Sequence, residues 1–332
     1  MHYNLDKAYK TIGEYGRSQW LLTFVNCVAR NAGTYMYYPF AYLVLEQKFL
    51  CYDDGLSTGR ECSSTEICAS RDANPLYNAY EVDTSYQYYI KNWFLEMDLV
   101  CMTPARIGIM ISAYYIGFAI GGLCCAWPDK YGRKFSCMFG LLLASISQTV
   151  MIASPNFWVR FAMFFLSGLS QIKNSVSYVW LSECTSQPYK AQSFTWINIF
   201  DALPMVLTCG YFMLVSKNWM HLPLFFTILS YIALFLAYFC PESPRWLLVN
   251  GQSSEAITVL NQMARVNKSA GTIPTNALFV EDPTNIQLLA EGAASTAHKK
   301  SSVGAESPLR AGSKEQAMHE PLLAINSPEK AV

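Results

Sequence analysis

Apolar residues gather in six long stretches within the first 240 residues of the chain. The stretches cover Trp20–Leu45, Ala105–Trp127, Phe135–Ala153, Phe157–Leu181, Ala191–Val215 and Trp219–Phe239. A helix of about 20 residues crosses a hydrocarbon layer about 30 Å thick, so each stretch is long enough for one membrane span. One such stretch could be a buried helix of a soluble protein, but six in succession make that alternative poor. The pattern therefore predicts an all-α membrane protein with six spans.

The composition fits a membrane protein better than a soluble enzyme. Only 14% of the residues are charged, whereas an ordinary soluble domain has about 25%. The 24 basic residues balance the 24 acidic ones, so nothing indicates the basic face of a nucleic-acid-binding protein. We find no phosphate-binding loop, nucleophile elbow or metal-ligand spacing in the sequence, so an enzyme, a cofactor or a metal site is not expected.

Lysine and arginine predict which parts of the chain face the cytoplasm. The basic residues before the first span and between the second and third are Lys7, Lys10, Arg17, Lys130, Arg133 and Lys134. Basic residues accumulate on the cytoplasmic side of membrane proteins. This rule places residues 1–19 and the C-terminus in the cytoplasm and residues 46–104 outside. The expected location is the plasma membrane.

The predicted extracellular loop, residues 46–104, contains four cysteines: Cys51, Cys62, Cys68 and Cys101. An even number of cysteines in an extracellular segment indicates disulfide bonds. Four cysteines allow three pairings, and the sequence does not select among them. Free thiols are the alternative.

The composition changes after Pro241. Within residues 241–270, apolar side chains recur every three or four residues over Asn250–Lys268, which predicts an amphipathic cytoplasmic helix. Residues 271–332 contain no Trp or Tyr and a single Phe. Such a segment buries too little apolar surface to offset the entropy lost on ordering. We therefore expect a disordered cytoplasmic tail over residues 271–332.

Several spans carry polar residues that are costly in contact with lipid. They are Asn26 and Arg30 in the first span, Gln171, Lys173, Asn174 and Tyr178 in the fourth, and Asn198 and Asp201 in the fifth. Residues four apart share a helix face, so Asn26, Arg30 and Thr34 should point into the bundle. Two interpretations remain open. The polar faces line a substrate cavity, or they form a structural network in which Asp201 pairs with Arg30 or Lys173.

Residues near the span ends predict where the membrane interface lies. Five tryptophans occupy such positions: Trp20, Trp127, Trp158, Trp180 and Trp219. Indole rings favour the headgroup region, and long basic side chains reach toward it. We therefore expect two aromatic belts and an Arg160 side chain that extends to the interface.

Small residues mark one face of the second span. Ala113, Gly117 and Gly121 are four residues apart, which allows another helix to approach closely. A packing face is the preferred interpretation, although glycine is also frequent in membrane helices in general.

The breaks between the spans resemble signatures of a known transporter superfamily. Pro128–Lys134 (PDKYGRK) resembles the Asp-x-x-Gly-Arg-Arg/Lys signature of the major facilitator superfamily, in its expected place after the second span. Pro241–Leu248 (PESPRWLL) resembles the Pro-Glu-Ser-Pro-Arg-Trp-Leu signature of the organic cation, carnitine and anion transporter branch. Ile12–Gln19 (IGEYGRSQ) and Glu96–Cys101 (EMDLVC) resemble segments of the same branch. The resemblance extends over residues 1–270.

The resemblance implies a fold and a mechanism. Members of the superfamily have about twelve spans in two six-helix halves that rock between outward-open and inward-open states. This chain then corresponds to the N-terminal half, with its large extracellular loop between spans one and two. Without the second half, Gly117 and Gly121 could lack a packing partner. Five charged residues match family positions that lock the cytoplasmic helix ends together: Asp129, Arg133, Glu183, Glu242 and Arg245.

The first functional prediction is transport of organic ions, cations or zwitterions such as carnitine-like substrates, by alternating access. Asp201 is the residue expected to attract positive charge. The alternative is a non-transporting half-transporter that binds and regulates a full-length relative. A homo-oligomer of six-helix units and an incomplete gene model also fit the sequence. The expected partners are an organic ion and the lipid bilayer, and nucleic acid is not one of them.

Overall fold

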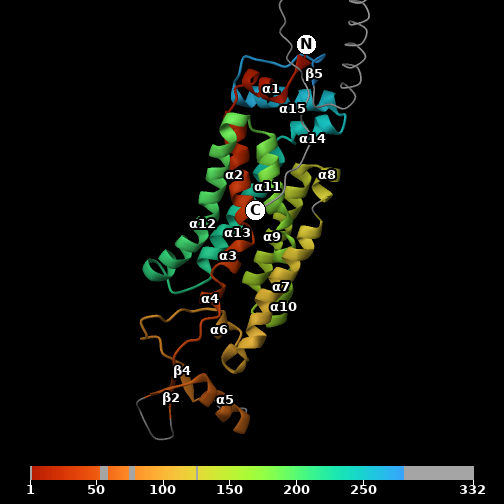
Figure 1. Cartoon of the computed structure of the whole chain (residues 1–332). Coiled ribbons are helices and arrows are strands. Elements are labelled where there is room, and N and C mark those ends of the chain that lie inside the picture. The colour runs from red at the N-terminus through yellow and green to blue at the C-terminus, as the bar shows by residue number, and fades with distance from the viewer. Residues whose placement is uncertain (1, 53–58, 75–78, 125, 280–332) are drawn as a thin grey trace, which may run out of the picture. The chain divides into compact units, whose positions relative to one another are not determined.

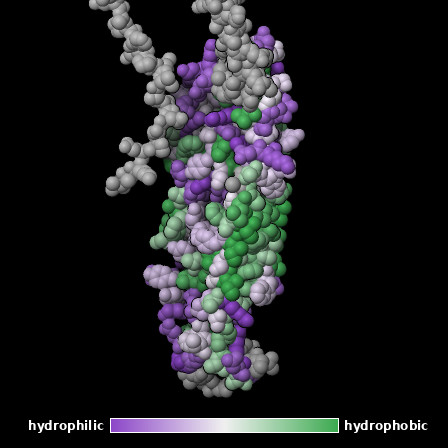
Figure 2. All heavy atoms as spheres, turned by 45° about the vertical axis from the view of Figure 1, so that its right-hand side comes forward, coloured by the Kyte–Doolittle hydropathy of each residue, from purple (hydrophilic) through white to green (hydrophobic). Residues whose placement is uncertain are grey.

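The computed structural model describes residues 2–52, 59–74, 79–124 and 126–279. All of them belong to one compact unit, Met1–Ile286. Among these described residues, four helices are long and apolar enough to cross a membrane. They are α7 (Pro104–Leu123), α9 (Arg133–Ala153), α12 (Lys190–Leu214) with the preceding 3-10 turn η2 (Gln187–Tyr189), and α13 (His221–Phe239). These helices coincide with the predicted second, third, fifth and sixth spans. Apolar side chains cover the middle of the helical bundle, and hydrophilic side chains gather toward both ends (Figure 2).

The first and fourth spans are broken, which the apolar pattern does not indicate. The first comprises α2 (Arg17–Asn31), α3 (Thr34–Tyr37) and α4 (Phe40–Leu43), and the fourth comprises α10 (Phe157–Leu169) and α11 (Ile172–Glu183). The breaks at Gly33 and Gln171 face each other. Gln171 Nε2 donates to the Ala32 carbonyl at 3.5 Å, and Ser167 Oγ donates to the Gly33 carbonyl at 3.3 Å. Irregular backbone at membrane depth is tolerated where protein groups satisfy it in this way.

Helix α2 packs against α11, α12 and α13, while α9 packs against α10, α11 and α13 (Figure 1). Helices α7 and α10 approach each other closely at glycines on both helices. A methyl group added at Gly117 would lie 2.1 Å from the Phe165 carbonyl oxygen, and one added at Gly168 would lie 2.0 Å from the Tyr114 carbonyl oxygen. The small-residue face of the second span is therefore a packing face. The expectation that Gly117 and Gly121 lack a partner was wrong, because α10 of the same six-span set packs on them.

This contact predicts a large effect of a single methyl group. Gly117→Ala should destabilise the protein by about 1–3 kcal/mol, because the added carbon meets backbone that cannot move without shifting a helix. Gly108→Ala on the same helix is the matched control, since nothing lies within 4 Å of the carbon it adds. Thermal unfolding of the purified protein in detergent measures both variants. Equal midpoints for the two variants would contradict the packing assignment.

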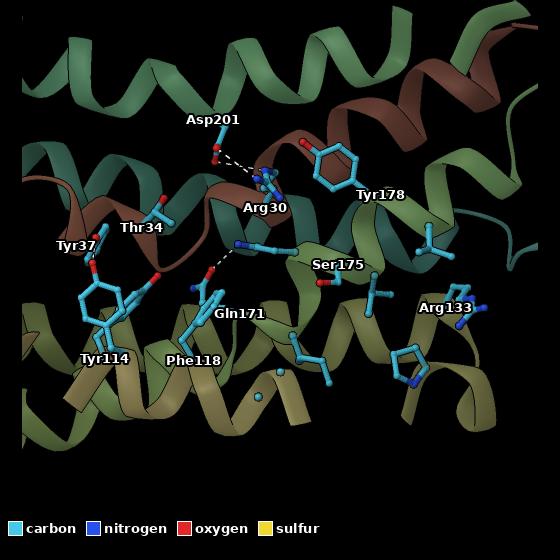
Figure 3. A pocket seen from close by; sticks show the side chains of 18 of the residues that line it. Arg30, Thr34, Tyr37, Tyr114, Phe118, Arg133, Gln171, Ser175, Tyr178 and Asp201 are labelled. Carbon is cyan, nitrogen blue, oxygen red and sulfur yellow. Dashed lines mark hydrogen bonds and ion pairs between the residues drawn. The ribbon is translucent and has the colours of Figure 1, made fainter. Parts of the chain in front are cut away.

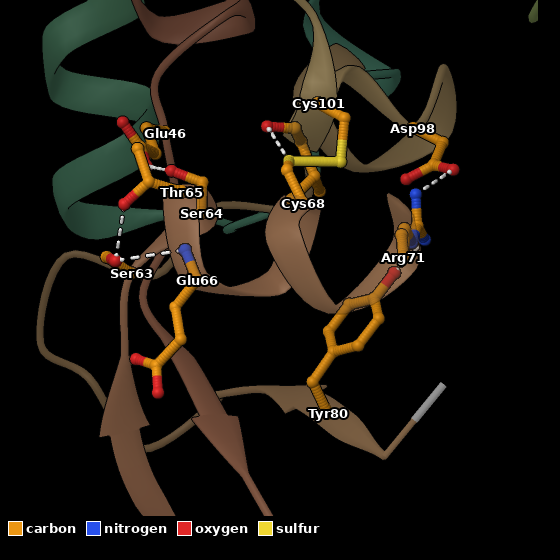
Figure 4. The surroundings of a disulfide bond; sticks show 11 residues. Glu46, Ser63, Ser64, Thr65, Glu66, Cys68, Arg71, Tyr80, Asp98 and Cys101 are labelled. Atoms are coloured by element: carbon orange, nitrogen blue, oxygen red, sulfur yellow. Dashed lines mark hydrogen bonds and ion pairs between the residues drawn. A yellow bond between two sulfur atoms is a disulfide. The ribbon is translucent and has the colours of Figure 1, made fainter. Parts of the chain in front are cut away.

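Residues between the first two spans form a small cross-linked subdomain. It contains β2 (Phe49–Cys51), β3 (Arg60–Cys62), β4 (Tyr80–Val82), α5 (Ser64–Ala73), α6 (Trp93–Glu96) and the 3-10 turn η1 (Leu99–Cys101). The strands form an antiparallel sheet in the order β3-β2-β4, with Phe49 opposite both Cys62 and Val82. Disulfides join Cys51 to Cys62 and Cys68 to Cys101, and Arg71 beside the second disulfide contacts Asp98 and Tyr80 (Figure 4).

Arg160 connects this subdomain to the bundle. Its side chain is 1% exposed and lies between the rings of Trp93 and Trp219, with the guanidinium carbon 4.4 Å and 5.3 Å from the two centroids. Its Nη2 contacts Glu96 Oε2 at 2.9 Å, and Glu96 Oε1 accepts a hydrogen bond from Trp219 Nε1 at 2.7 Å. The expectation that Arg160 reaches the membrane interface was therefore wrong, because a carboxylate and two indoles hold it inside the protein. Trp219 and Trp180 are likewise buried, and neither contributes to an aromatic belt.

The opposite end of the bundle carries the remaining elements (Figure 1). They are β1 (His2–Tyr3), α1 (Leu5–Thr11), α8 (Trp127–Tyr131), α14 (Pro244–Val249), α15 (Ser253–Asn267) and β5 (Leu278–Phe279), and β1 pairs with β5 in parallel. The apolar face of α15 is buried, as its periodicity predicts. These buried residues are Ala256, Ile257, Leu260, Met263 and Ala264.

The disordered tail was predicted to begin at residue 271, but some of the residues that follow are packed in the core. Ile273, Ala277 and Phe279 are at most 4% exposed and belong to the same apolar core as α1 and α15. The low aromatic content of the whole segment concealed these few buried positions, so the expectation was wrong for residues 271–279. Residues 280–332, the rest of that prediction, lie outside the described residues.

Candidate functional site

A cavity of about 670 Å³ lies among α2, α3, α7, α11 and α12. Five predicted cavity residues line it: Arg30, Gln171, Asn174, Tyr178 and Asp201. Arg30 and Asp201 point toward each other in the cavity, with Tyr37 and Tyr114 to one side and Arg133 at the other (Figure 3). The two helix breaks contribute directly, because Thr34 and Gln171 also line the cavity.

Arg30 and Asp201 form an ion pair across the cavity. Arg30 Nε lies 3.4 Å from Asp201 Oδ1, and Arg30 Nη2 donates to Asp201 Oδ2 at 3.4 Å. The guanidinium carbon also lies 4.7 Å from the centre of the Tyr178 ring, whose hydroxyl donates to Asn198 Oδ1 at 2.6 Å. The two charged side chains remain 19% and 27% exposed. The pair thus joins two helices, as the interpretation of a structural network predicts, and it also faces the cavity.

Three predicted cavity residues do not line it. Asn26 and Lys173 are fully buried, with Asn26 Nδ2 donating to the Leu22 carbonyl at 2.8 Å and Lys173 Nζ to the Ser170 carbonyl at 3.4 Å. Asn198 does not line the cavity, but its Oδ1 accepts a hydrogen bond from the hydroxyl of Tyr178, which does. A four-residue spacing identifies a helix face, but it does not tell which part of that face a neighbouring helix covers. Neighbouring helices cover Asn26 and Lys173 here.

Tyrosines form the part of the cavity wall that the sequence analysis missed. Tyr37, Tyr38, Tyr114 and Tyr115 all line the cavity. The rings of Tyr37 and Tyr114 stack with centroids 4.7 Å apart, and the hydroxyls of Tyr37 and Tyr115 are hydrogen-bonded. The sequence did hold a signal, because residues 37 and 38 follow Thr34 by three and four positions on the polar face of the first span. Aromatic faces attract cations, so tyrosines and a carboxylate together suit a positively charged ligand.

Four of the five predicted lock residues form a connected network at the α15 end of the bundle. Arg133 Nη1 contacts Asp129, and its Nε and Nη2 contact the two oxygens of Glu183 at 3.2 Å and 3.4 Å. Ser243 Oγ donates to Glu183 Oε2 at 2.7 Å. Arg133 and Asp129 also line the cavity, so the network lies at one end of it (Figure 3).

Glu242 caps the first turn of α9. Its Oε1 accepts backbone N–H bonds from Arg133, Lys134 and Ser243 at 2.9–3.0 Å. A carboxylate at a helix N-terminus is favoured by the helix dipole. Burial nevertheless raises the pKa of Glu242 above its usual value, against the effect of these hydrogen bonds. Arg245, the fifth predicted residue, makes no ion pair or hydrogen bond through its side chain within the described residues.

The cap depends on Gly132, which immediately precedes α9. Gly132 has φ +99°, and a methyl group there would lie 2.6 Å from Glu242 Oε2. Gly132→Ala should therefore cost about 1–3 kcal/mol of stability through backbone strain alone. Gly122→Ala is the control, because nothing lies within 4 Å of its added carbon. A thermal midpoint that falls for Gly132→Ala and holds for Gly122→Ala is the expected result in detergent, and an unchanged Gly132→Ala midpoint would contradict the cap.

Comparison with known proteins places the chain among transporters. Residues 67–285 match the family described as "Sugar (and other) transporter". Organic cation/carnitine transporter 6 of Arabidopsis thaliana is 29% identical over 267 residues, which cover 75% of this chain and 50% of that protein. Solute carrier family 22 member 27 of Mus musculus is 27% identical, covering 61% and 37%. Human organic cation/carnitine transporter 2 is 28% identical, covering 61% and 36%. These relatives confirm the resemblance to the organic cation and carnitine branch.

Two solved structures are also similar to this chain. The human organic anion transporter MFSD10 matches at 17% identity with a TM-score of 0.43, covering 68% of this chain and 48% of that one. The proton:xylose symporter XylE matches at 18% identity with a TM-score of 0.41, covering 79% and 50%. The chain spans about a third to a half of the length of the curated relatives described above.

Proposed function

Because this chain belongs to the Sugar (and other) transporter family of the major facilitator superfamily, we propose that it takes part in moving organic cations or zwitterions across a membrane. The observation that carries the proposal is the cavity, which a carboxylate and several tyrosine rings line together. Asp201 supplies negative charge, and the rings of Tyr37, Tyr114 and Tyr178 supply faces on which a quaternary ammonium group can rest. A zwitterion would place its own carboxylate toward Arg30.

The mechanism we propose begins with competition inside the cavity. An incoming cation competes with Arg30 for the Asp201 carboxylate. Binding of the cation would therefore weaken the ion pair that joins α2 to α12. The network around Arg133 lies at the end of the same cavity and ties α8, α9, α11 and α14 together. Alternating access would require that this end open while the other closes.

The basic residues before the first span support a cytoplasmic location for the α15 end, and the disulfides support an extracellular location for the subdomain between spans one and two. A cysteine-labelling experiment tests this orientation in cells. A membrane-impermeant maleimide should leave Cys124, which is exposed near the α15 end, unlabelled until the cells are permeabilised. Labelling of Cys124 in intact cells would reverse the proposed orientation.

Transport is tested with the purified chain in liposomes. We expect radiolabelled tetraethylammonium to accumulate above the level of protein-free liposomes and to bind the detergent-solubilised protein. Binding with uptake supports transport by the chain itself. Binding without uptake would support only a ligand-binding role, and absence of both would overturn the proposal.

The alternative is that the chain associates with another transporter and alters its activity. Exposed apolar side chains on α7 and α12, the helices that flank the cavity, form a surface that a partner transporter would cover in place of lipid. They include Ile116, Phe118 and Leu123 on α7, and Met205, Val206 and Met213 on α12. Co-expression with a full-length relative tests it: the relative's flux should change in proportion to the amount of this chain. An unchanged flux, with both proteins in the same membrane, would remove the alternative.

A further inference from the structure

A second, smaller cavity lies at the α15 end of the bundle, separate from the cavity that contains Arg30 and Asp201. Its volume is about 180 Å³. It is enclosed by α1, the end of α11, η2 with the first residue of α12, and α14. The residues that matter below are Asp6, Glu183, Thr185, Lys190 and Arg245, all of which line it.

Two cations face this cavity without an anionic partner. Within the described part of the chain, the side chains of Lys190 and Arg245 make no ion pair and no hydrogen bond. Thr185 adds a third unsatisfied group. It is 1% exposed, and its buried Oγ1 has no hydrogen-bond partner. A buried hydroxyl without a partner costs about 1–3 kcal/mol, so the wall of the cavity beside the two cations is not fully satisfied by the protein itself.

The acidic residues around the cavity are largely engaged elsewhere. The Glu183 carboxylate is held by Arg133 and Ser243, and its backbone carbonyl accepts the Tyr9 hydroxyl. Burial raises the pKa of Tyr9 well above its usual value, so that hydroxyl stays neutral. Asp6 accepts a weak hydrogen bond from the Gln187 N–H at 3.4 Å. Among the described residues, the cavity therefore contains two cations without an ion-pair partner, Lys190 and Arg245, and one weakly engaged carboxylate, that of Asp6.

We propose that this cavity binds a phosphate group. The Arg245 guanidinium would take two phosphate oxygens, and Lys190 would act as a compact point charge beside it. The volume equals several water molecules at about 30 Å³ each, which leaves room for a phosphate and the start of an ester substituent. The phosphate can belong to a lipid headgroup or to a soluble phosphate ester.

Two arms of one experiment separate these sources. In the first, inorganic phosphate is titrated into the chain in phosphatidylcholine nanodiscs, and phosphorus NMR line widths report binding. In the second, nanodiscs with and without phosphatidylinositol 4-phosphate are compared by native mass spectrometry for retained lipid. Binding in the first arm alone assigns a soluble ligand, and retention in the second alone assigns a headgroup. Wild-type protein that binds in neither arm overturns the proposal.

Variants test the geometry. Arg245→Gln should weaken binding at least about tenfold, since it removes a charge-assisted contact. Asp6→Asn should strengthen binding, because it removes the negative charge of a weakly engaged carboxylate from the cavity. Arg265→Gln is the matched control: it removes an equal charge from the exposed face of α15 and should leave binding unchanged. Equal losses in Arg245→Gln and Arg265→Gln would show a diffuse attraction and would overturn the site.

Discussion

Replacing Asp201 with asparagine should weaken binding of tetraethylammonium by about tenfold to a hundredfold. The carboxylate is the negative charge that faces the tyrosines, and interactions with a charged group are worth about 1.5–3 kcal/mol. The change also leaves Arg30 without its ion-pair partner, so an unopposed positive charge then repels the ligand. Equilibrium binding to the purified protein measures the loss.

A second substitution at the same ion pair should act in the opposite direction. Arg30→Gln removes the competitor for Asp201 and should tighten cation binding. Asp72→Asn is the control, because it makes the same chemical change on the exposed surface of α5, away from the cavity. If Asp201→Asn and Asp72→Asn bind tetraethylammonium equally well, Asp201 is not the cation site.

Glu96→Gln should be the most destabilising of the substitutions considered, at about 3–5 kcal/mol. Removing one partner of a buried ion pair leaves the other charge uncompensated in a poorly solvated place. Arg160 is such a charge, since it is 1% exposed between two tryptophans. The thermal or denaturant midpoint of the purified protein should fall accordingly.

A double-mutant cycle isolates this pair from general damage. Arg160→Met combined with Glu96→Gln should be less destabilising than the sum of the two single changes, because no buried charge remains. The exposed pair of Arg60 and Glu66 provides the control, and Glu66→Gln should leave the midpoint almost unchanged. Strict additivity at Arg160 and Glu96 would mean that the pair is not coupled.

Sequence alone predicted the helical elements where one physical rule dominates. Length and apolarity identified the continuous helices, and three- and four-residue periodicity identified α15. The breaks at Gly33 and Gln171 were not predicted, because the hydrogen bonds that join them connect residues far apart in the chain. The buried position of Arg160 was not predicted for the same reason, since its partner Glu96 lies in the subdomain between the first two spans.

The sequence predicted the charged residues of the candidate site but not the tyrosines that line its wall. Arg30 and Asp201 stood out because a charge inside a span requires an explanation. Tyr37 and Tyr114 did not, because tyrosine is common in membrane proteins and carries no such signal alone. Which buried polar groups reach a cavity depends on how neighbouring helices cover them, and that is a property of packing rather than of spacing.

The facing helix breaks have a consequence for water. The carbonyls of Ala32 and Gly33 accept side-chain hydrogen bonds from the fourth span at 3.5 Å and 3.3 Å, which are long and weak bonds. A water molecule can replace either donor at little cost. Breaking these two hydrogen bonds between the first and fourth spans should therefore cost less free energy when water fills the cavity than when the cavity is dry. The hydration of the cavity, and with it the osmotic strength of the medium, should set how readily these two spans part.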